Sequence, residues 1–291
     1  MPAAHDDLTI RRIVDIERFA LAADFLFPGA SLENPDAAML SLAGRHVDFA
    51  TGEVLLAIQS HVFRFAGKTI LIDTCVGEHK SRPLRPQWNQ RAATRYLADL
   101  AAAGWAPEQI DIVMCTHLHA DHVGWNTQLQ SGRWVPTFPR AHYVMSQREI
   151  DQRAQDAAQS PAANHGSFQD SVLPVIEAGL VQVVRPGDAI ADGASIVDLA
   201  GHGPGQIGLE VSSGAHSQVL FCGDAIHSPL QVLKPDWSSR FCFDPAQAAR
   251  VRQTLLERAA GGDLKLIPGH LRAGTMRIGE KNGKFQPIMD G

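Results

Sequence analysis

The sequence predicts an α/β fold. Short apolar runs typical of buried strands alternate with amphipathic helical segments along most of the 291 residues. Apolar residues make up 45% of the chain and charged residues 20%, as in a globular protein. A chain of this length buries about three quarters of the surface that it exposes when unfolded, so its core needs no additional cross-link to be stable. We expect one globular domain over residues 1–291.

The predicted strands are short runs rich in branched and aromatic residues. They are residues 10–16, 54–65, 69–72, 110–115, 142–145, 181–184, 195–199, 207–211, 219–221 and 264–267. The turn at residues 66–68 is typical of a hairpin between the second and third of them. Two more short strands are expected near the C-terminus, at 275–278 and 284–287.

Three helices are predicted from periodicity and from capping residues. The first covers 87–103, where apolar residues recur on one face until Gly104. The second begins at Ser146, with Glu149 completing a capping box. The third begins after Asp244, which precedes a proline at the first helical position, and ends at residues 261–262.

Residues 20–50 and 225–243 are too long for simple connections, and segments of this kind often form pocket walls or lids. Their aromatic side chains, with one from the intervening chain, are candidates for an apolar pocket wall, although such a side chain taken alone is more often part of the core. The candidates are Phe25, Phe27, Trp125, Trp237, Phe241 and Phe243. A basic cluster of Lys80, Arg82, Arg85 and Arg91 is interpreted as a solvated loop.

Charge and cysteine content exclude several classes of protein. The net charge is −5, which disfavours nucleic acid as a partner. The four cysteines are scattered, as expected of free thiols in a reducing cytoplasm. The N-terminal residues have no apolar stretch typical of a signal peptide, and no run approaches the 18 apolar residues of a membrane span. We expect a cytoplasmic protein without a membrane partner.

The strongest chemical signal is a histidine-rich segment directly after the strand at 110–115. It contains His117, His119, Asp121 and His122. Alternate residues that leave a strand point the same way, so His117 and His119 are placed to converge on one metal ion. The turn that follows would direct Asp121 and His122 towards a second ion. The alternative is a polar loop in which these histidines cap a helix.

Three further candidates follow predicted strands. His202 comes after the strand at 195–199, Asp224 after 219–221 and His270 after 264–267. A single histidine or aspartate at a strand end is more often an ordinary hydrogen-bonded residue. Together they indicate a site, because ligands of α/β proteins bind where several strand ends meet.

These motifs, in this order, resemble the metallo-β-lactamase superfamily. The resemblance covers nearly the whole chain and implies a four-layer αβ/βα sandwich. It implies that His117, His119 and His202 hold one metal ion, that Asp121, His122 and His270 hold a second, and that Asp224 bridges them. It also implies that Asp73 orients a ligand histidine. Cys75 stands where the family usually has glycine.

The donor set itself indicates two divalent metal ions and hydrolysis. Five imidazoles and two carboxylates suit Zn²⁺, with Fe, Mn or Co as alternatives, and argue against Mg²⁺ or Ca²⁺. Two such ions about 3.5–4 Å apart share a water molecule and lower its pKa from near 16 towards 7. Two aspartates and one hydroxide leave such a centre with a residual charge of +1, which stabilises an anionic transition state.

Within the superfamily, the chain resembles the branch of acyl-homoserine lactonases and methyl parathion hydrolase. Asp224 stands where secreted β-lactamases have cysteine, and His119 where flavodiiron proteins have glutamate. The chain shows no basic face for RNA, and the short segment after His270 leaves no room for the helical domain of the glyoxalase II branch. The resemblance implies a hydrolase acting on an ester bond, in a lactone or an open ester.

The lactonases place a tyrosine three residues after the bridging aspartate, and here that residue is His227. Its imidazole is a candidate hydrogen-bond donor to the substrate, catalytic together with Asp121 and Asp224, and the alternative is packing within its loop. Gln206 replaces a non-ligand histidine of many relatives. The expected substrate is a small molecule with an apolar or aromatic part, and the relatives suggest a homodimer.

Other reactions on the same scaffold remain alternatives. They are hydrolysis of phosphotriesters, phosphodiesters or β-lactams, a mononuclear iron dioxygenase acting on sulfur compounds, and a non-catalytic binding protein.

Overall fold

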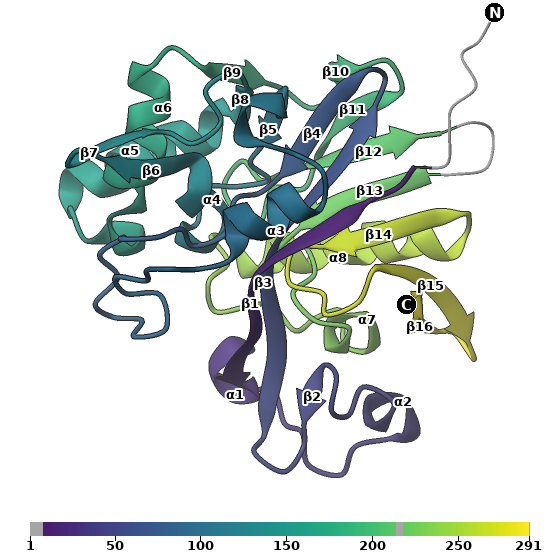
Figure 1. Ribbon diagram of the computed structural model, residues 1–291. Coiled ribbons are helices and arrows are strands. Elements are labelled where there is room, and N and C mark those ends of the chain that lie inside the picture. Colours follow the sequence, from purple (N-terminus) through teal and green to yellow (C-terminus); the bar gives the residue numbers. More distant parts are fainter. Residues whose placement is uncertain (1–7, 214–217, 291) are drawn as a thin grey trace, which may run out of the picture. The chain divides into compact units, whose positions relative to one another are not determined.

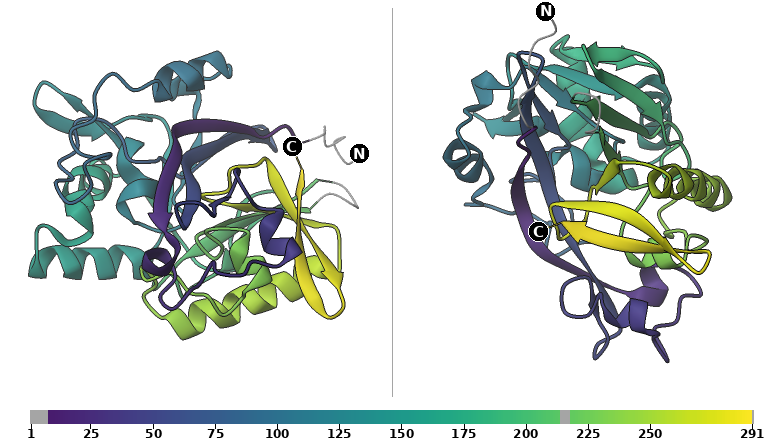
Figure 2. Two further views of the ribbon diagram at one scale, coloured as in Figure 1. Left: turned by 90° about the horizontal axis from the view of Figure 1, so that it is seen from below. Right: turned by 90° about the vertical axis from the view of Figure 1, so that its right-hand side faces the viewer.

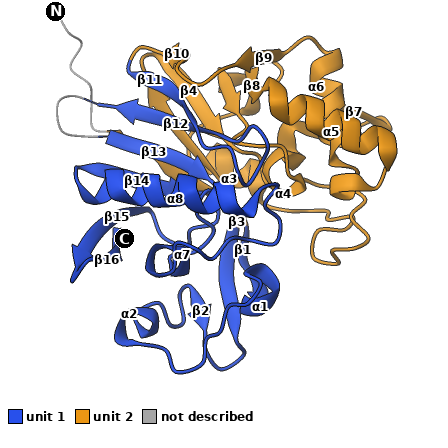
Figure 3. Ribbon diagram, turned by 180° about the vertical axis from the view of Figure 1, so that it is seen from behind, with its two compact units in different colours: residues 1–6, 16–57, 193–291 blue, residues 7–15, 58–192 orange. Residues whose placement is uncertain are grey.

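The computed structural model describes residues 8–213 and 218–290 (Figure 1). Residues 1–7, on which the expectation about a signal peptide rests, lie outside the described residues. The described chain divides into two compact units (Figure 3). Unit 1 comprises residues 16–57 and 193–290, and unit 2 comprises residues 8–15 and 58–192.

Unit 2 is built on a sheet of order β1-β3-β4-β5-β8-β9, whose first two strands continue into unit 1. Their bounds are β1 (Arg11–Ala22), β3 (Glu53–Phe65), β4 (Lys68–Ile72), β5 (Ile112–Met114), β8 (His142–Ser146) and β9 (Val181–Val184). The pairs from β4 to β9 are parallel. All three residues of β5 are buried, as the apolar run at 112–115 predicts. The strands expected here are confirmed, with β1 longer and β5 shorter.

One helix of unit 2 differs from the expected one. α3 covers only Tyr96–Ala102, because the backbone of residues 87–95 does not adopt a helical conformation. Gln90 and Ala93 have φ values of 50° and 56°, and the Gln90 N–H donates to the Lys80 carbonyl. The backbone of this stretch therefore pairs with a neighbouring loop, and the helix predicted from residue 87 is wrong in its first half.

The remaining elements of unit 2 are mostly short. α5 (Gln147–Gln159) confirms the helix expected after Ser146, although Ser146 makes no side-chain cap. The other elements of unit 2 are η1 (Pro107–Gln109), α4 (Ala120–Val123), η2 (Gly124–Asn126), β6 (Thr127–Gln130), β7 (Arg133–Pro136), η3 (Ala163–Gly166), η4 (Phe168–Val172), α6 (Leu173–Glu177) and β10 (Ala189–Ala191). β6 and β7 form an antiparallel hairpin that the sequence did not predict.

The basic cluster of unit 2 is not a solvated loop. The side chains of Lys80 and Arg82 are fully buried, and Arg82 forms a two-pronged hydrogen bond with the carboxylate of Asp170. The Lys80 ammonium lies 3.5 Å from the ring centroid of Trp134, and burial lowers its pKa to about 7. Arg91 pairs with Asp15. The interpretation as a solvated loop is therefore wrong for Lys80, Arg82 and Arg91, which are buried or paired with an acidic residue.

Unit 1 contains a second sheet, of order β11-β12-β13-β14-β15-β16. The strands are β11 (Ala194–Asp198), β12 (Ile207–Ser212), β13 (Gln218–Gly223), β14 (Leu264–Pro268), β15 (Thr275–Lys281) and β16 (Lys284–Asp290). β13 and β14 are parallel neighbours, and β15 and β16 form the expected C-terminal hairpin. Helix α8 (Pro245–Ala260) packs beside β14 and β15 (Figure 2) and is capped by the Asp244 side chain, as predicted.

The two long segments without predicted structure contain short elements of unit 1. These are α1 (Ala23–Leu26), α2 (Ala37–Leu40), β2 (Val47–Asp48) and α7 (Leu230–Leu233). The core of the unit lies between its sheet and α8 and includes Leu220, Leu256 and Leu266, all fully buried. Within the described residues, no helix is both long enough and apolar enough to cross a bilayer.

Candidate metal centre

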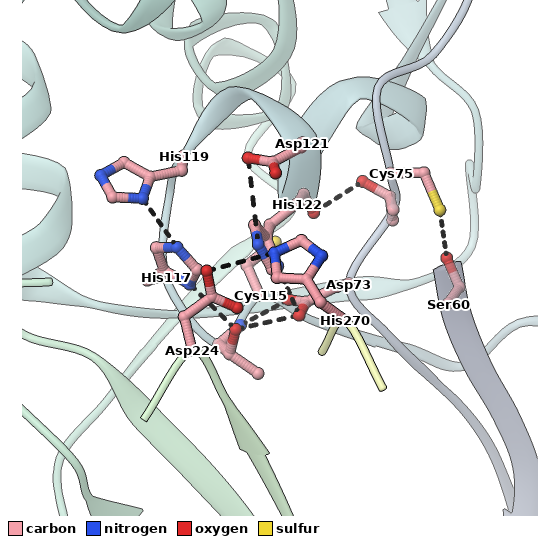
Figure 4. Close-up of polar contacts among 12 residues, drawn as sticks. Ser60, Asp73, Cys75, Cys115, His117, His119, Asp121, His122, Asp224 and His270 are labelled. Carbon is pink, nitrogen blue, oxygen red and sulfur yellow. Dashed lines mark hydrogen bonds and ion pairs between the residues drawn. The ribbon is translucent and has the colours of Figure 1, made fainter. Parts of the chain in front are cut away.

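In unit 2, the histidine-rich segment leaves β5 in an extended conformation and enters α4 at Ala120. One ring nitrogen of His117 lies 2.9 Å from a ring nitrogen of His119, and the rings of His117 and His122 lie 4.1 Å apart (Figure 4). His122 Nε2 lies 3.9 Å from Asp121 Oδ1. The four candidate ligands of this segment therefore lie beside one another.

Asp73, at the end of β4, orients this segment. Its Oδ2 lies 2.9 Å from His122 Nδ1, and its two oxygens accept the N–H and the hydroxyl of Thr116. A carboxylate on one ring nitrogen of a histidine fixes the tautomer and directs the other nitrogen to a metal. The contact expected between Asp73 and a ligand histidine is present.

Residues 74–77 run against the other side of the segment. The N–H of Thr74 donates to the carbonyl of His122, and the N–H of Gly124 donates to that of Cys75, both at 2.7 Å. A Cβ atom on Gly124 would lie 1.9 Å from the carbonyl carbon of Val76. Only glycine permits this approach, so the position after α4 is fixed by backbone contact.

Cys75 has a left-handed backbone, with φ of 54°, which accounts for the glycine that relatives have there. Its thiol is buried, and Sγ lies 3.3 Å from the Ser60 hydroxyl, which in turn lies 2.7 Å from the hydroxyl of Tyr96. Burial raises the pKa of the Cys75 thiol well above its usual value. The thiol is therefore a neutral packing group and not a nucleophile.

In unit 1, three histidines surround one carboxylate oxygen. Asp224 follows β13 and His270 follows β14, so the parallel pairing of these strands brings them together. Asp224 Oδ2 lies 3.4 Å from His202 Nε2 and 3.2 Å from both His227 Nε2 and His270 Nε2. All four side chains are at most 4% exposed. Donor atoms of His202, Asp224 and His227 lie within 4.8 Å of one another, close enough to bind one ion.

Each of the three histidines that surround Asp224 has a further polar partner. His270 Nδ1 lies 2.8 Å from the carbonyl oxygen of Ala57, and His202 Nδ1 lies 3.5 Å from Cys242 Sγ. The N–H of His227 donates to Gln231. Ala57, Cys242 and Gln231 were not identified from the sequence, since nothing local marks a backbone carbonyl or a distant thiol as a partner.

The loop that carries His202 packs against the start of α8. The N–H groups of Phe243 and Asp244 donate to the carbonyls of His202 and Gly201 at 2.8 and 2.9 Å. A Cβ on Gly201, whose φ is 149°, would lie 2.6 Å from the backbone nitrogen of Ala248. The residues at the start of α8 therefore also place His202.

The aromatic candidates separate into core and surface. Phe27 and Trp125 are at most 3% exposed and belong to the core. Phe25 and Phe241 are more than one third exposed and meet edge to face at 6.1 Å. Trp237 packs on Phe27 at 6.0 Å, and Phe243 is exposed. The Gln206 amide donates to the Cys222 carbonyl at 3.5 Å.

The residues present fit a divalent transition metal. The donors are imidazole nitrogens and carboxylate oxygens, the set that Zn²⁺ and its neighbours prefer and that Mg²⁺ and Ca²⁺ do not. His122 and His270 each direct one nitrogen to an oxygen acceptor, which leaves the other for a metal. The chemistry of the donors and the partners behind them both match a metal centre.

Several solved structures resemble this chain over nearly its whole length. A hydrolase of the β-lactamase superfamily, AbOPH, matches with a TM-score of 0.78 and 22% identity, covering 98% of this chain and 95% of that one. AidC, described as a dizinc quorum-quenching lactonase, has a TM-score of 0.77 and 20% identity with the same coverage. An N-acyl homoserine lactone hydrolase has a TM-score of 0.60 and 18% identity, covering 90% and 92%. The shared fold confirms the predicted α/β class.

No curated protein sequence matches the chain. The family model of the metallo-beta-lactamase superfamily matches residues 54–270, about three quarters of the sequence. The match includes every candidate ligand, from the histidine-rich segment to His270. This chain belongs to the metallo-beta-lactamase superfamily.

Proposed function

We propose that the protein is a metal-dependent hydrolase with two divalent ions that opens a lactone or cleaves a carboxylic ester. The observation that carries the proposal is the convergence of three imidazole Nε2 atoms on Asp224 Oδ2, at 3.2–3.4 Å, in unit 1. Membership of the superfamily supports joining this set with the four ligands of unit 2.

The proposed ligand sets follow the family pattern. His117, His119 and His202 would hold the first ion, Asp121, His122 and His270 the second, and Asp224 would bridge them. Zn²⁺ is the metal we favour, with Fe, Mn and Co as alternatives, because the donors are mostly imidazoles. The structural neighbour described as a dizinc lactonase supports the same choice.

When bound, two such ions would supply a hydroxide at neutral pH and stabilise negative charge on the carbonyl oxygen. The side chains of this protein would do the remaining work. Asp121 or Asp224 would take the proton released as the oxygen nucleophile attacks the carbonyl carbon, and would return it to the leaving oxygen. The new C–O bond would form first and give an oxyanion, and the ester C–O bond would break when this oxyanion collapses, so that the products are a carboxylate and an alcohol.

His227 is the proposed hydrogen-bond donor to the substrate. Its ring is 3% exposed, its Nε2 lies 3.2 Å from Asp224 Oδ2, and its Nδ1 has no hydrogen-bond partner within the described residues. A neutral imidazole has one N–H, which suits it to the developing oxyanion. It would replace the tyrosine that the lactonases have at this position.

The proposed substrate is a small molecule with an apolar or aromatic part. The exposed pair of Phe25 and Phe241 in unit 1 supports this choice, since exposed aromatic side chains favour apolar ligands. The acidic net charge and the burial of Lys80 and Arg82 support the absence of a nucleic-acid partner. A homodimer and a cytoplasmic location complete the proposal, the latter supported by four free cysteines.

The test is a substrate panel measured on the purified protein and on the H117A and D224A variants. The panel contains a lactone, an aryl ester, a phosphotriester, a phosphodiester and a β-lactam. We expect the highest kcat/KM for the lactone or the ester, and a loss of about 10²-fold or more in each variant. Faster hydrolysis of a phosphorus ester or a β-lactam, or full activity in either variant, would contradict the proposal.

A further inference from the structure

The histidine-rich segment of unit 2 is held by a side chain more than forty residues away. Asn164 Oδ1 accepts the N–H of Ala120 at 3.1 Å, and Asn164 Nδ2 donates to the carbonyl of Leu118 at 2.6 Å. The two bonded groups belong to the residues on either side of His119. One carboxamide therefore bridges the backbone that carries this histidine.

A second side chain holds the same stretch. The N–H of Leu118 donates to Glu149 Oε2 at 3.2 Å, and Glu149 is 1% exposed. Arg153, one helical turn further along α5, lies 3.7 Å from that oxygen. Glu149, expected from the sequence to cap α5, instead accepts a hydrogen bond from the metal-binding segment. Both backbone hydrogen-bonding groups of Leu118 are thus occupied by side chains.

Asn164 occupies a strained turn. It has φ of 48° and ψ of 39°, His165 follows with 58° and 22°, and Gly166 has φ of 76°. A left-handed backbone costs about 1–2 kcal/mol for a residue with a side chain, and asparagine tolerates it better than most. Adjacent residues of this kind persist where the surroundings impose them, and they concentrate at functional sites.

We propose that Asn164 is a positioning residue for the metal centre, and this rests on the proposed function. Its carboxamide sets the path of the backbone on both sides of His119, so that His117, His119 and Asp121 keep a metal-binding arrangement before an ion arrives. Ligands that are already ordered lose less entropy when they bind a metal. Asn164 touches no substrate and acts only through the ligands that it places.

Three variants distinguish this positioning role from a general contribution of Asn164 to folding stability. N164G keeps access to the left-handed backbone and removes the carboxamide. N164D keeps an oxygen for the N–H of Ala120 but loses the N–H that serves Leu118. The matched control is S167A, because Asn164 Nδ2 also donates to Ser167 Oγ at 2.7 Å, a bond within the turn that does not reach the segment.

The measurement is zinc affinity, by competition with a chromophoric chelator, together with the melting temperature of the zinc-free and zinc-loaded protein. We expect zinc to bind about 10–100-fold more weakly to N164G, the range seen when a partner behind a ligand is removed. N164D should fall between N164G and the wild type, and S167A should match the wild type. The rise in melting temperature caused by zinc should shrink in N164G.

Wild-type zinc affinity in both N164G and N164D would overturn the proposal, and so would an equal loss in S167A. If N164G does not fold, as circular dichroism would show, the comparison of N164D with S167A decides. The readout does not depend on turnover. A protein that binds zinc in the expected order of variants but hydrolyses neither a lactone nor a carboxylic ester would support the role of Asn164 and contradict the proposed function alone.

Discussion

Asp73 Oδ2 lies 2.9 Å from Nδ1 of His122, and the same carboxylate accepts two hydrogen bonds from Thr116. The side chain is 3% exposed and stands at the end of β4, next to the strand that leads into the histidine-rich segment. One buried carboxylate thus joins two neighbouring strand ends and orients a candidate ligand. We therefore expect its removal to weaken metal binding more than it destabilises the core.

We predict that D73N weakens zinc binding by about 10–100-fold, because an amide is a weaker acceptor for the His122 ring and does not fix its tautomer. Chelator competition measures the change. The control is D111N, since Asp111 also accepts a backbone N–H at the sheet, that of Thr69, but contacts no candidate ligand in the described structure. Equal zinc affinity in D73N and D111N would contradict the prediction.

Removing the imidazole of His227 should lower kcat with little change in KM. Loss of one donor to an oxyanion reduces kcat by about 10²–10³-fold. We expect this from H227A, and a smaller loss from H227Y, which restores the hydroxyl that the lactonases have here. Steady-state kinetics on a lactone measure both. An unchanged kcat in H227A would show that His227 only packs in its loop.

G124A should destabilise the protein by about 3 kcal/mol or more, because the added methyl group meets backbone atoms of Val76 that have no room to move. Urea unfolding measures the loss. The control is G262A, where an added Cβ would have its nearest neighbour at 4.0 Å. The contact would be disproved if the two variants unfolded at the same urea concentration.

His46 should make the protein less stable in acid. Burial, with Arg45 and Arg272 nearby, lowers the pKa of His46 to about 4, whereas the unfolded chain has an ordinary value near 6.5. The unfolded state therefore binds more protons as the pH falls through this window. The contribution of His46 to the free energy of unfolding is fully present above pH 6.5. By pH 5 this free energy has fallen by about 2 kcal/mol through protonation of His46 in the unfolded chain.

The H46L variant tests this difference. Its free energy of unfolding should fall less between pH 7 and pH 5 than that of the wild type, by about 2 kcal/mol. Chemical denaturation of both proteins at the two pH values gives the comparison. Parallel pH profiles for wild type and variant would show that His46 keeps an ordinary pKa in the folded protein.

The strands and candidate ligands could be predicted because their signals are local. An unbroken apolar run indicates a buried strand, and a histidine or aspartate directly after it lies at the sheet edge wherever the strand is placed. His202, Asp224 and His270 each follow this rule. The start of α8 was equally predictable, since Asp244 and the proline after it act within one helical turn.

The features that were missed depend on contacts between distant segments. The apolar pattern predicts a helix from residue 87, but the backbone of residues 87–95 bonds to residues 79 and 80 instead. Lys80 and Arg82 are buried because Asp170 lies beside them, which no local pattern shows. Asn164 and the carbonyl of Ala57 support candidate ligands from 44 and 213 residues away, so only the folded chain reveals them.

The most direct test of the central claim is zinc titration of the metal-free protein, followed by elemental analysis and lactone hydrolysis at each step. The account predicts that hydrolysis is absent without metal, returns as zinc is added and reaches its maximum at two ions per chain. Full hydrolysis by protein that elemental analysis shows to be metal-free, or a maximum at one ion per chain, would contradict it.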